Sequence, residues 1–541
     1  MHHLRQTDNS IQRGFVLALA ESLRQQTPEK PVRLLETHIS WVLLAGRYAY
    51  KIKKAVDLGF LDFSSLEDRR HYCEEEIRLN RRLAPNIYLD VVSIGGSLDG
   101  PVLGGQPAVE YAVRMRRFPL SKQLDKLVAS NRLLPRHIDR LAETIAGFHN
   151  SLAGADQHAT FGTAESVGRA AEQNFEQLQG LLTVPDELDR LTVLHHASDS
   201  EFSACGHLFG ERLAQGFVRE CHGDLHLGNI VLMGDQPTPF DGIEFSPALR
   251  WIDVISEVAF TMMDLMYHRR ENLSYRFLNT YLEITGDYAG LRLLRFYLAY
   301  RAMVRVKVSA IRAAQPGLTP REVTAARNAC RAYLALAERC FVRTRPALII
   351  THGLPGSGKS TFAQMALERL QAIRLRSDVE RKRLYGLGAL ADSRKNADVD
   401  LYSEEATRRT YARLYGLARE LLLGGNRVIV DAAFINFKER ELFRQLAAEL
   451  SVPFVIAAIS ASNDILRQRI IQRQRAASDA SEADVAVLEK LQDEQQPLSL
   501  KEREIAATFV NEDAGIAADK AGWARLYQLS GSTISEVPGQ T

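Results

Sequence analysis

The chain has 541 residues, more than a single hydrophobic core usually serves, so two or three domains are expected. Hydrophobic residues make up 46% and charged residues 25% of the sequence, which excludes a collagenous, low-complexity or disordered chain. The 68 lysines and arginines nearly balance the 66 acidic residues, and the net charge of +2 excludes a general attraction to nucleic acid or anionic membranes. A local basic patch is still allowed.

The cysteines and the apolar runs bear on the cellular compartment. The five cysteines are odd in number and widely spaced, and they form no C-x-x-C pair: Cys73, Cys205, Cys221, Cys330 and Cys340. This pattern argues against a disulfide framework or a structural zinc site. The short apolar run GFVLALAES lacks the flanks of a signal peptide, and no apolar stretch approaches the ~18 residues that span a bilayer. A cytoplasmic protein without a membrane partner is therefore expected.

The N-terminal region predicts one helix and then a strand-rich segment. Residues 11–25 have the spacing of an amphipathic helix, which Pro28 and Pro31 interrupt. The stretch RLLETHISWVLLAGRYAYKIKKAV contains short β-branched and aromatic runs with Gly46 at a turn, which is typical of consecutive antiparallel strands. Residues 65–83 then predict a charged helix with a polar start.

The middle of the chain is mainly helical. Strand-like runs at 88–94 and 108–117 are followed by helical periodicity to about residue 215. The segment CHGDLHLGN, a hairpin and long helices that end near Val342 complete this part.

The pattern changes at RTRPALIITHG, where Pro346 precedes a continuous apolar run and a glycine-rich turn, as in a buried parallel strand. Strands near residues 347, 373, 427 and 453 then alternate with helical stretches, which predicts βαβ units and a parallel sheet. We therefore expect an N-terminal helix at 1–30, a first domain at 31–340 and a second domain at 346–541.

The second domain contains a phosphate-binding signature. The stretch GLPGSGKS fits G-x-x-x-x-G-K-[ST] and has the required context of a preceding strand and a following helix. Its glycines allow backbone N–H groups to surround phosphate oxygens, Lys359 is expected to reach the β- and γ-phosphates, and Ser360 is expected to bind Mg²⁺. The predicted nucleotide-binding residues are Gly353, Pro355, Gly356, Ser357, Gly358, Lys359, Ser360 and Thr361.

Two aspartates follow strands of the same predicted sheet. NRVIVDAAF contains a buried strand ending at Asp431, which is expected to hold Mg²⁺; capping of the next element is the alternative. In RLRSDVERKRLYG, Asp378 stands where a second strand ends, at the edge where open α/β sheets bind ligands. Asp378 could accept a proton from an acceptor hydroxyl, and Arg376 and Arg381 could bind an anionic substrate.

A later helix supplies two further arginines. ILRQRIIQRQR places Arg469 and Arg473 four residues apart on one helix face, which suits a lid that closes on the transferred phosphoryl group. A solvated charged face is the alternative. Together with the glycine-rich turn, these residues resemble small P-loop kinases that act on non-protein acceptors: gluconate and shikimate kinases, zeta toxins and the kinase domain of polynucleotide kinases. The D-x-x-R of Asp378 and Arg381 is similar to the polynucleotide kinase arrangement, which implies a base and a contact to the acceptor phosphate.

The first domain carries a different signature. In HGDLHLGN, Asp224 and Asn229 have the D-x-x-x-x-N spacing of the catalytic loop of the protein-kinase fold, in which the aspartate is the base and the asparagine holds Mg²⁺. Asp241 in FDGIEF follows the hairpin IVLMGDQPTPF, where a second metal-binding aspartate belongs. A zinc site at His222, Asp224 and His226 is the alternative. The strings HGDLHLGNI and FDGIEF resemble those of the aminoglycoside phosphotransferase family.

This resemblance implies a strand lysine that pairs with the α- and β-phosphates and a helix glutamate that orients it. Lys51 in AYKIKK is the first candidate for the lysine, Lys53 on the same strand face is the alternative, and Glu76 is the candidate glutamate. The phosphate-covering loop would lie at ETHIS, which has no glycine and so departs from the family. Asp253 and Glu257 in WIDVISEVAF are expected to tie the catalytic loop to the helical lobe.

The sequence therefore predicts an α+β protein-kinase-like domain followed by an α/β P-loop domain with a parallel sheet. It resembles bacterial chains described as bifunctional aminoglycoside phosphotransferase and ATP-binding proteins. Both domains are expected to use ATP and Mg²⁺, with Asp224 and Asp378 as the bases and small hydroxylated molecules as the acceptors. The alternatives are a polynucleotide 5′-hydroxyl kinase, in which nucleic acid binds the second domain, and a nucleotide-binding regulator with an inactive kinase-like domain.

Overall fold

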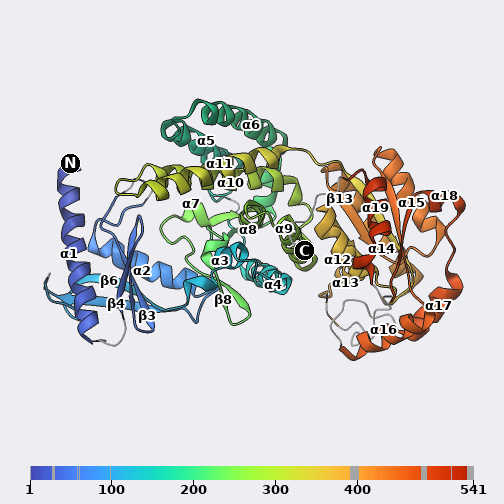
Figure 1. Ribbon diagram of the computed structural model, residues 1–541, viewed down its shortest axis with the longest axis horizontal. Coiled ribbons are helices and arrows are strands. Elements are labelled where there is room, and N and C mark those ends of the chain that lie inside the picture. Colours follow the sequence, from blue (N-terminus) through green and yellow to red (C-terminus); the bar gives the residue numbers. More distant parts are fainter. Residues whose placement is uncertain are drawn as a thin grey trace. The chain divides into compact units, whose positions relative to one another are not determined.

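The computed structural model describes residues 2–26, 31–57, 59, 61–97, 99–156, 158–389, 391, 401, 403–476, 484–512 and 515–532, and the side chains of residues 2–10 and 473–476 lie outside this description. The chain forms two compact units, Met1–Gly180 with Phe202–Asp264, and Leu181–Glu201 with Leu265–Thr541. Figure 1 follows the chain through them by colour. These units group residues by contact rather than by sequence signal, so the domain boundaries expected above stay predictions.

The first unit is built on a six-stranded antiparallel sheet with the strand order β1-β2-β3-β6-β4-β5. Gly46 turns the chain between β2 and β3 with a φ of 57°, a left-handed conformation that costs glycine little. The predicted run of antiparallel strands is confirmed, and the short strand β5 adds to it. The strands are β1 (Arg33–Glu36), β2 (Ser40–Ala45), β3 (Tyr48–Lys53), β4 (Tyr88–Gly96), β5 (Pro101–Leu103) and β6 (Ala108–Arg116).

One helix packs against each face of this sheet. Helix α1 (His2–Gln26) buries Phe15 and Leu19 in an apolar cluster with β2 and β3. The buried Gln12 side chain donates a hydrogen bond to the Lys53 carbonyl at 2.9 Å, which fixes α1 on the sheet. Helix α2 (Leu66–Asn80) begins at the capping residue Ser65 and packs its apolar residues against β4 and β6 in a separate cluster.

Helices and two small antiparallel strand pairs make up the rest of this unit. The hairpin predicted after the catalytic-loop segment is confirmed as β8 (Ile230–Met233) and β9 (Gln236–Pro239), and β7 (Val218–Glu220) pairs with β10 (Trp251–Asp253). An antiparallel sheet near the start of the unit, followed by a mainly helical part, gives the α+β class expected of the first domain. The further elements are η1 (Leu120–Lys122), α3 (Leu124–Ala129), α4 (Pro135–Ser151), α5 (Ala164–Leu181), η2 (Leu227–Asn229) and α7 (Pro247–Arg250). Two more helices belong to both units: α6 (Pro185–Ala214) is in the second unit up to Glu201 and in the first from Phe202, and α8 (Val254–Tyr267) is in the first unit up to Asp264.

The second unit contains a five-stranded parallel sheet with the order β12-β13-β11-β14-β15. The strand β11 lies at its centre and its residues are fully buried, which explains its continuous apolar sequence. Strands β11 to β14 were predicted, whereas β15 was not. The strands are β11 (Ala347–His352), β12 (Ile373–Arg376), β13 (Arg427–Asp431), β14 (Phe454–Ser460) and β15 (Ala506–Val510).

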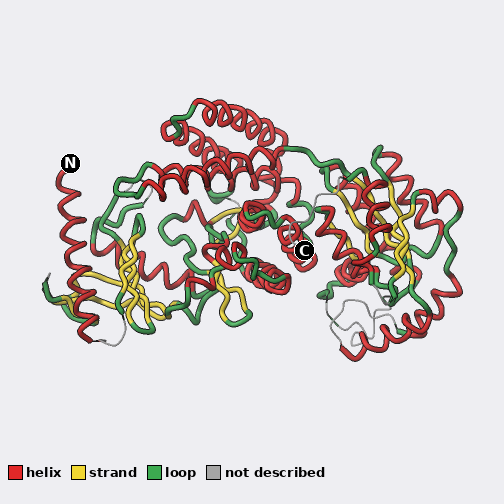
Figure 2. The backbone as a smooth tube through the Cα atoms, viewed as in Figure 1, coloured by secondary structure: helices red, strands yellow, loops and turns green. Residues whose placement is uncertain are grey.

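Helices cover both faces of the parallel sheet (Figures 1 and 2). On one face α12 (Lys359–Leu370) and α19 (Lys520–Ser530) form the main apolar core with the strands, and α14 (Glu404–Leu423) and α15 (Phe437–Glu449) contact the other face. The α/β class predicted for the second domain is therefore confirmed. The remaining elements are α9 (Glu271–Thr285), α10 (Leu291–Ala313), α11 (Pro320–Phe341), α13 (Ser377–Leu384), α16 (Asn463–Ala476), α17 (Val485–Glu494), α18 (Leu500–Glu504) and η4 (Ile516–Ala518).

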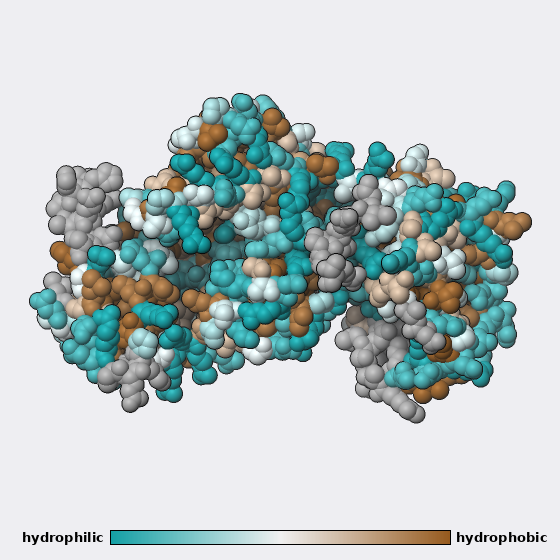
Figure 3. All heavy atoms as spheres, in the orientation of Figure 1, coloured by the Kyte–Doolittle hydropathy of each residue, from teal (hydrophilic) through white to brown (hydrophobic). Residues whose placement is uncertain are grey.

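Hydrophilic residues cover most of the face of the molecule seen in Figure 3, with apolar patches between them. Among the helices in the described ranges, none combines the length and the apolar character that crossing a membrane requires. All five cysteines are buried free thiols, in agreement with the absence of a disulfide framework expected from their spacing.

Candidate functional site

The P-loop lies between the central strand β11 and helix α12. Gly353 has a φ of 152° and Gly358 a φ of 100°, both outside the range that other residues adopt readily. A Cβ atom at Gly353 would collide with the Ile459 carbonyl oxygen, and one at Gly358 would collide with the side-chain amide nitrogen of Asn511. The turn therefore needs glycine at both positions, and it leads directly into the positive N-terminus of α12, where phosphate groups bind favourably.

The two predicted metal ligands of this site lie in contact. Asp431 ends β13, which is the neighbour of β11, and its carboxylate accepts a hydrogen bond from the Ser360 hydroxyl. Asp431 is only 5% exposed, and within the described part of the chain its Oδ2 atom has no hydrogen-bond partner. Burial raises the pKa of Asp431, although Arg376, Arg374 and Lys359 act in the opposite direction. A buried carboxylate oxygen beside a hydroxyl is a donor set that fits a hard divalent cation such as Mg²⁺.

Two cationic side chains border the glycine-rich turn. Lys359 folds back so that its ammonium group donates to the Leu354 carbonyl at 2.9 Å. Arg469 projects from α16, and its Nη1 atom lies 3.4 Å from the Gly356 carbonyl oxygen. Arg473 belongs to the same helix, but its side chain lies outside the described residues. One of the two predicted lid arginines is therefore brought to the P-loop, and the pairing of both remains a prediction.

The predicted acceptor residues lie at the carboxyl end of β12. Asp378 is half-buried in the first turn of α13. Arg376 lies 3.4 Å from the Glu283 carboxylate of α9 through its Nη1 atom, and Arg381 is 8% exposed and donates to the Leu401 carbonyl at 3.2 Å. Both arginines are thus engaged by groups of the protein itself, a feature that their sequence positions did not indicate.

The catalytic-loop signature of the first unit folds into a compact turn. The side chain of Asn229 donates to the Asp224 carboxylate at 2.8 Å, so the predicted base and metal ligand are neighbours. His222 is 4% exposed and its Nε2 atom lies 2.9 Å from the Phe240 carbonyl oxygen. Burial lowers the pKa of His222, which favours the neutral ring as a structural hydrogen-bond donor. Within the described residues, the ligand atoms of His222, Asp224 and His226 do not form a close metal-binding set.

Helix α8 supports this loop from beneath. Glu257 accepts a hydrogen bond from the Gly223 amide at 2.7 Å, Thr261 donates to the Leu225 carbonyl at 2.8 Å, and Asp264 accepts from the Leu227 amide at 2.9 Å. The sequence indicated a tying role for Glu257 but missed Thr261 and Asp264. The sequence feature that could have identified them is the spacing of Glu257, Thr261 and Asp264, which follow one another at four and three residues along the mainly apolar helix α8.

The two candidate lysines of β3 share one glutamate. Lys51 lies 2.8 Å from one carboxylate oxygen of Glu76 and 2.5 Å from Asp241, whereas Lys53 lies 2.8 Å from the other oxygen of Glu76 and also pairs with Glu244. Burial opposes ionisation of Glu76, but the two lysines lower its pKa to about 2. Only Lys51 connects the helix glutamate to the predicted metal-binding aspartate.

Glu244 was part of the quoted string FDGIEF, but the sequence assigned it no role. Its side chain is 4% exposed, and burial raises its pKa despite the pairing with Lys53. The sequence feature that could have identified Glu244 is its D-x-x-E spacing from Asp241. Asp241 itself has a φ of 63°, and its side chain is 43% exposed. Asp241 therefore faces outward while Glu244 faces the interior.

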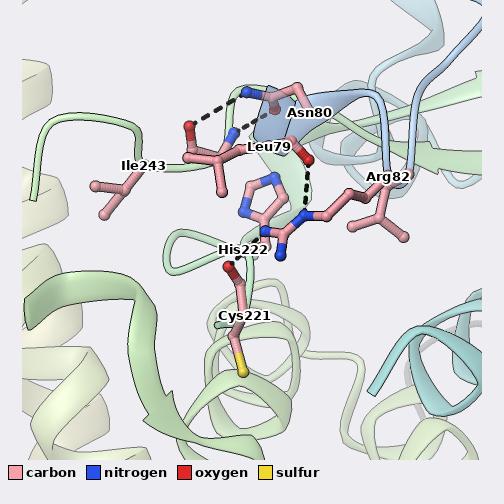
Figure 4. A pocket seen from close by; sticks show the side chains of 8 residues that line it. Leu79, Asn80, Arg82, Cys221, His222 and Ile243 are labelled. Carbon is pink, nitrogen blue, oxygen red and sulfur yellow. Dashed lines mark hydrogen bonds between the residues drawn. The ribbon is translucent and has the colours of Figure 1, made fainter. Parts of the chain in front are cut away.

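A small enclosed cavity lies between α2 and the catalytic loop (Figure 4). Its volume is about 10 Å³, which at most holds one water molecule. Arg82 crosses it and donates to the carbonyl groups of Leu79 at 3.0 Å and Cys221 at 3.2 Å. This cavity belongs to the packing that joins α2 to the catalytic loop and is too small for a ligand.

Comparison with known proteins shows the family of the chain. Residues 348–498 match a family model described as an AAA domain. Uncharacterized proteins of Mycobacterium tuberculosis and Mycobacterium bovis are 32% identical to the chain over 465 residues, which is 85% of this chain and 90% of theirs. The chain belongs to the family of these mycobacterial proteins. A match of 465 residues is longer than either unit, so it extends over parts of both.

The solved structures that are similar to this chain fall into two groups, which cover different shares of it. A choline/ethanolamine kinase family protein from Mesorhizobium loti covers 60% of this chain and 99% of its own, with 13% identity and a TM-score of 0.35. A putative kinase from Chloroflexus aurantiacus covers 35% of this chain and 100% of its own, with 23% identity and a TM-score of 0.27. Each of these structures matches only part of this chain, with an identity below 25%.

Proposed function

We propose that the chain is an ATP-dependent phosphotransferase with two kinase-type sites, each of which transfers the γ-phosphate of ATP to a hydroxyl group of a small non-protein acceptor. The observation that carries the proposal is the contact between Ser360 and the buried Asp431 beside the P-loop. A carboxylate with an unpartnered oxygen is costly to bury, and a metal ion bound with a nucleotide would compensate it.

In the P-loop site, the backbone N–H groups of residues 353–358 and the start of α12 would hold the phosphates of ATP. Ser360 and Asp431 would hold Mg²⁺, which supplies charge neutralisation of the phosphate oxygens. Lys359 would exchange its contact with the Leu354 carbonyl for a phosphate oxygen, and Arg469 would stabilise the transferred group. Asp378 would accept the proton of the acceptor hydroxyl.

In the first unit, Lys51 would contact the α- and β-phosphates while Glu76 keeps its ammonium group in place. Asn229 and Asp241 would hold Mg²⁺, and Asp224 would accept the acceptor proton. The short segment between β1 and β2 would cover the phosphates without a glycine, so side chains and not bare backbone would face them there.

The test is transfer of labelled γ-phosphate from Mg·ATP to pools of sugars, aminoglycosides, nucleosides and 5′-hydroxyl oligonucleotides. We expect Asp224→Ala and Lys359→Ala each to lower the yield of a different product, by on the order of 10²-fold or more. The exposed residues Asp99 and Lys501 supply matched controls for Asp224→Ala and Lys359→Ala. Asp99 lies between β4 and the edge strand β5, and Lys501 lies in α18 before the amino end of β15, whereas the P-loop follows the carboxyl end of β11.

The outcomes separate the competing functions. If the wild type labels an oligonucleotide and Lys359→Ala does not, the acceptor of the P-loop site is nucleic acid and not a small molecule. If both substitutions weaken ATP binding but no acceptor is labelled by the wild type, the phosphotransferase proposal is wrong and a nucleotide-binding regulator is the better account.

A further inference from the structure

An open cavity of about 740 Å³ lies at one end of the six-stranded sheet. It is formed by the β2–β3 turn at 46–48, by Leu89 at the start of β4, and by segment 116–119 that leaves β6. These segments meet because Tyr48 pairs with Arg116 in the sheet and the Arg117 amide donates to the Arg47 carbonyl at 3.0 Å. We call this space the arginine cavity. Its volume is within the range of pockets that bind small molecules.

Three arginines give this cavity its charge. Arg47, Arg116 and Arg117 are exposed, and in the described part of the chain none of them forms an ion pair with a carboxylate. Like charges held close together repel each other, and an anion between them would remove that repulsion. Because the whole chain has a net charge of only +2, this concentration of positive charge is local and does not follow from composition.

An acidic side chain beside this cavity, Asp90, is already paired. Asp90, which follows Leu89 on β4, accepts hydrogen bonds from Nε and Nη2 of Arg114 at 2.8 and 2.5 Å. Arg81 at the end of α2 adds a further guanidinium group nearby, since its Nε atom donates to the Tyr88 carbonyl at 3.1 Å. The surroundings of the arginine cavity therefore add positive charge to it.

An aromatic ring holds part of this arrangement in place. The guanidinium carbon of Arg47 lies 5.0 Å from the ring centre of Tyr48, and that of Arg114 lies 5.4 Å from the same ring. Such cation–π contacts orient the charged groups at low cost. Because arginines already cover the Tyr48 ring, the ring is poorly placed to stack on a nucleic-acid base, which favours a compact anion over a single strand.

The arginine cavity is separate from the phosphotransfer site proposed for the same unit. Lys51, Asp224 and Asp241 do not line it. The lining residue Phe118 also packs toward that site, since its ring lies 4.8 Å from the ring of Phe240, the neighbour of Asp241.

We propose that the arginine cavity binds a small anion with several phosphate groups, through charge-assisted hydrogen bonds from Arg47, Arg116 and Arg117. Guanidinium groups match the paired oxygens of phosphate in geometry, and three of them around one cavity suit a ligand with more than one phosphate. This site is additional to the two ATP sites, and its existence does not depend on their activity.

The test uses inorganic tripolyphosphate as the probe, titrated calorimetrically into the full chain in EDTA, where metal-dependent phosphate binding is suppressed. The background variant Lys359→Ala removes the phosphate-binding lysine of the P-loop. In this background we expect saturable binding that weakens at least tenfold in the double variant Arg116→Ala/Arg117→Ala and also weakens as salt concentration rises. Arg321→Ala/Arg327→Ala is the matched control, because it removes two exposed arginines of α11 in the second unit.

Three results would overturn the proposal: no saturable binding, equal affinity in the wild-type cavity and the Arg116→Ala/Arg117→Ala variant, or an equal loss in the Arg321→Ala/Arg327→Ala control. Binding of a single-stranded oligonucleotide through the same arginines, with none of tripolyphosphate, would also overturn it in favour of nucleic acid. Since Arg116 and Arg117 are exposed, the double variant is expected to keep the thermal midpoint of the parent, which excludes loss of binding through unfolding.

Discussion

At the scale of single residues, Glu76 is the centre of a buried charge network. Each of its carboxylate oxygens holds one lysine, and Glu244 and Asp241 complete the network on either side. Lys53 is fully buried between two carboxylates, whereas Lys51 ends beside Asp241, which is 43% exposed. The two lysines are alike in sequence, yet Lys53 is enclosed between two buried carboxylates, whereas Lys51 also pairs with a partly exposed one.

Replacing these lysines one at a time is expected to separate the two roles. Lys53→Met leaves Glu76 and Glu244 buried beside each other, so the free energy of unfolding of the first unit should fall by about 3–5 kcal/mol. Lys51→Met should cost less, because water reaches Asp241, but it should abolish the phosphotransfer that depends on Asp224. Urea denaturation and labelled-phosphate transfer measure the two effects, with the exposed Lys126→Met as the control. Equal stability losses for both variants would contradict this division.

Glu257 makes the stability of the first unit depend on pH. Burial opposes its ionisation, but the hydrogen bond from His149, the electrostatic influence of the nearby His149 and His222 rings and the hydrogen bond from the Gly223 amide lower its pKa to about 2 from an ordinary value of 4.5. In the folded protein Glu257 stays ionised down to pH about 2, while in the unfolded chain it takes up a proton near 4.5. Its stabilising contribution is therefore complete above 4.5 and is lost as the pH falls toward 2.

The substitution Glu257→Gln tests this dependence. At pH 7 it should destabilise the first unit by on the order of 3 kcal/mol, and the difference from wild type should shrink as the pH is lowered from 5 to 3. Denaturant unfolding at several pH values measures it. A difference that stays constant over this range would mean that packing of the side chain, and not its charge, stabilises the loop.

At the scale of elements, helix α9 closes one edge of the parallel sheet. The Asn279 side chain donates to the Ala372 carbonyl at 2.9 Å and accepts from the Arg374 amide at 2.7 Å, as a neighbouring strand would. One turn later, Glu283 holds Arg374 and Arg376 through its carboxylate. The edge strand β12 is thereby satisfied by a helix, and Arg376 is positioned at the end of that strand.

Asn279→Ala should therefore expose the edge of β12. Loss of two buried hydrogen bonds leaves the Arg374 amide without its partner, so the free energy of unfolding should fall by about 1–3 kcal/mol. Hydrogen exchange at the Arg374 amide should accelerate strongly, whereas Asn463→Ala on the exposed start of α16 should leave it unchanged. Unaltered exchange at Arg374 would show that the strand is protected without α9.

At the scale of the whole molecule, the P-loop unit recruits helices from outside the sequence range that predicts a P-loop domain. Tyr275 of α9 packs against the core of the parallel sheet, Arg276 pairs with Glu368 of α12 at 2.7 Å, and Tyr288 donates to Glu380 of α13 at 3.2 Å. The contacts of α9 thus make it part of the second unit, although it lies about 70 residues before the glycine-rich turn.

A fragment of residues 346–541 is therefore expected to be less stable than one of residues 265–541. The shorter fragment uncovers apolar core residues and the open edge of β12, which favours association between sheet edges. Its thermal midpoint and its fraction of monomer, measured by size-exclusion chromatography, should both be lower. Equal values for the two fragments would indicate that the P-loop domain folds without α9.

The sequence by itself determined the local features of both domains. The P-loop, the D-x-x-x-x-N loop and most of the strands were predicted because each is encoded within a short stretch, where glycine conformation, residue spacing and apolar periodicity act directly. The domain boundaries and the roles of individual site residues stay predictions. The strand β15 was missed, since AATFV has no distinctive flanking signal in a helical region.

Only the tertiary structure decided which distant residues meet. In the folded chain Asp431 lies beside Ser360, and Lys51 pairs with Asp241 whereas Lys53 does not. Thr261 and Asp264 form hydrogen bonds with the catalytic loop, and α9 forms hydrogen bonds with the edge of β12. The physical reason is that a charge or hydrogen bond acts over a few ångströms in space, and sequence spacing gives no distance between residues on different elements. The chemistry of each motif is therefore encoded locally, while its electrostatic setting is a property of the folded chain.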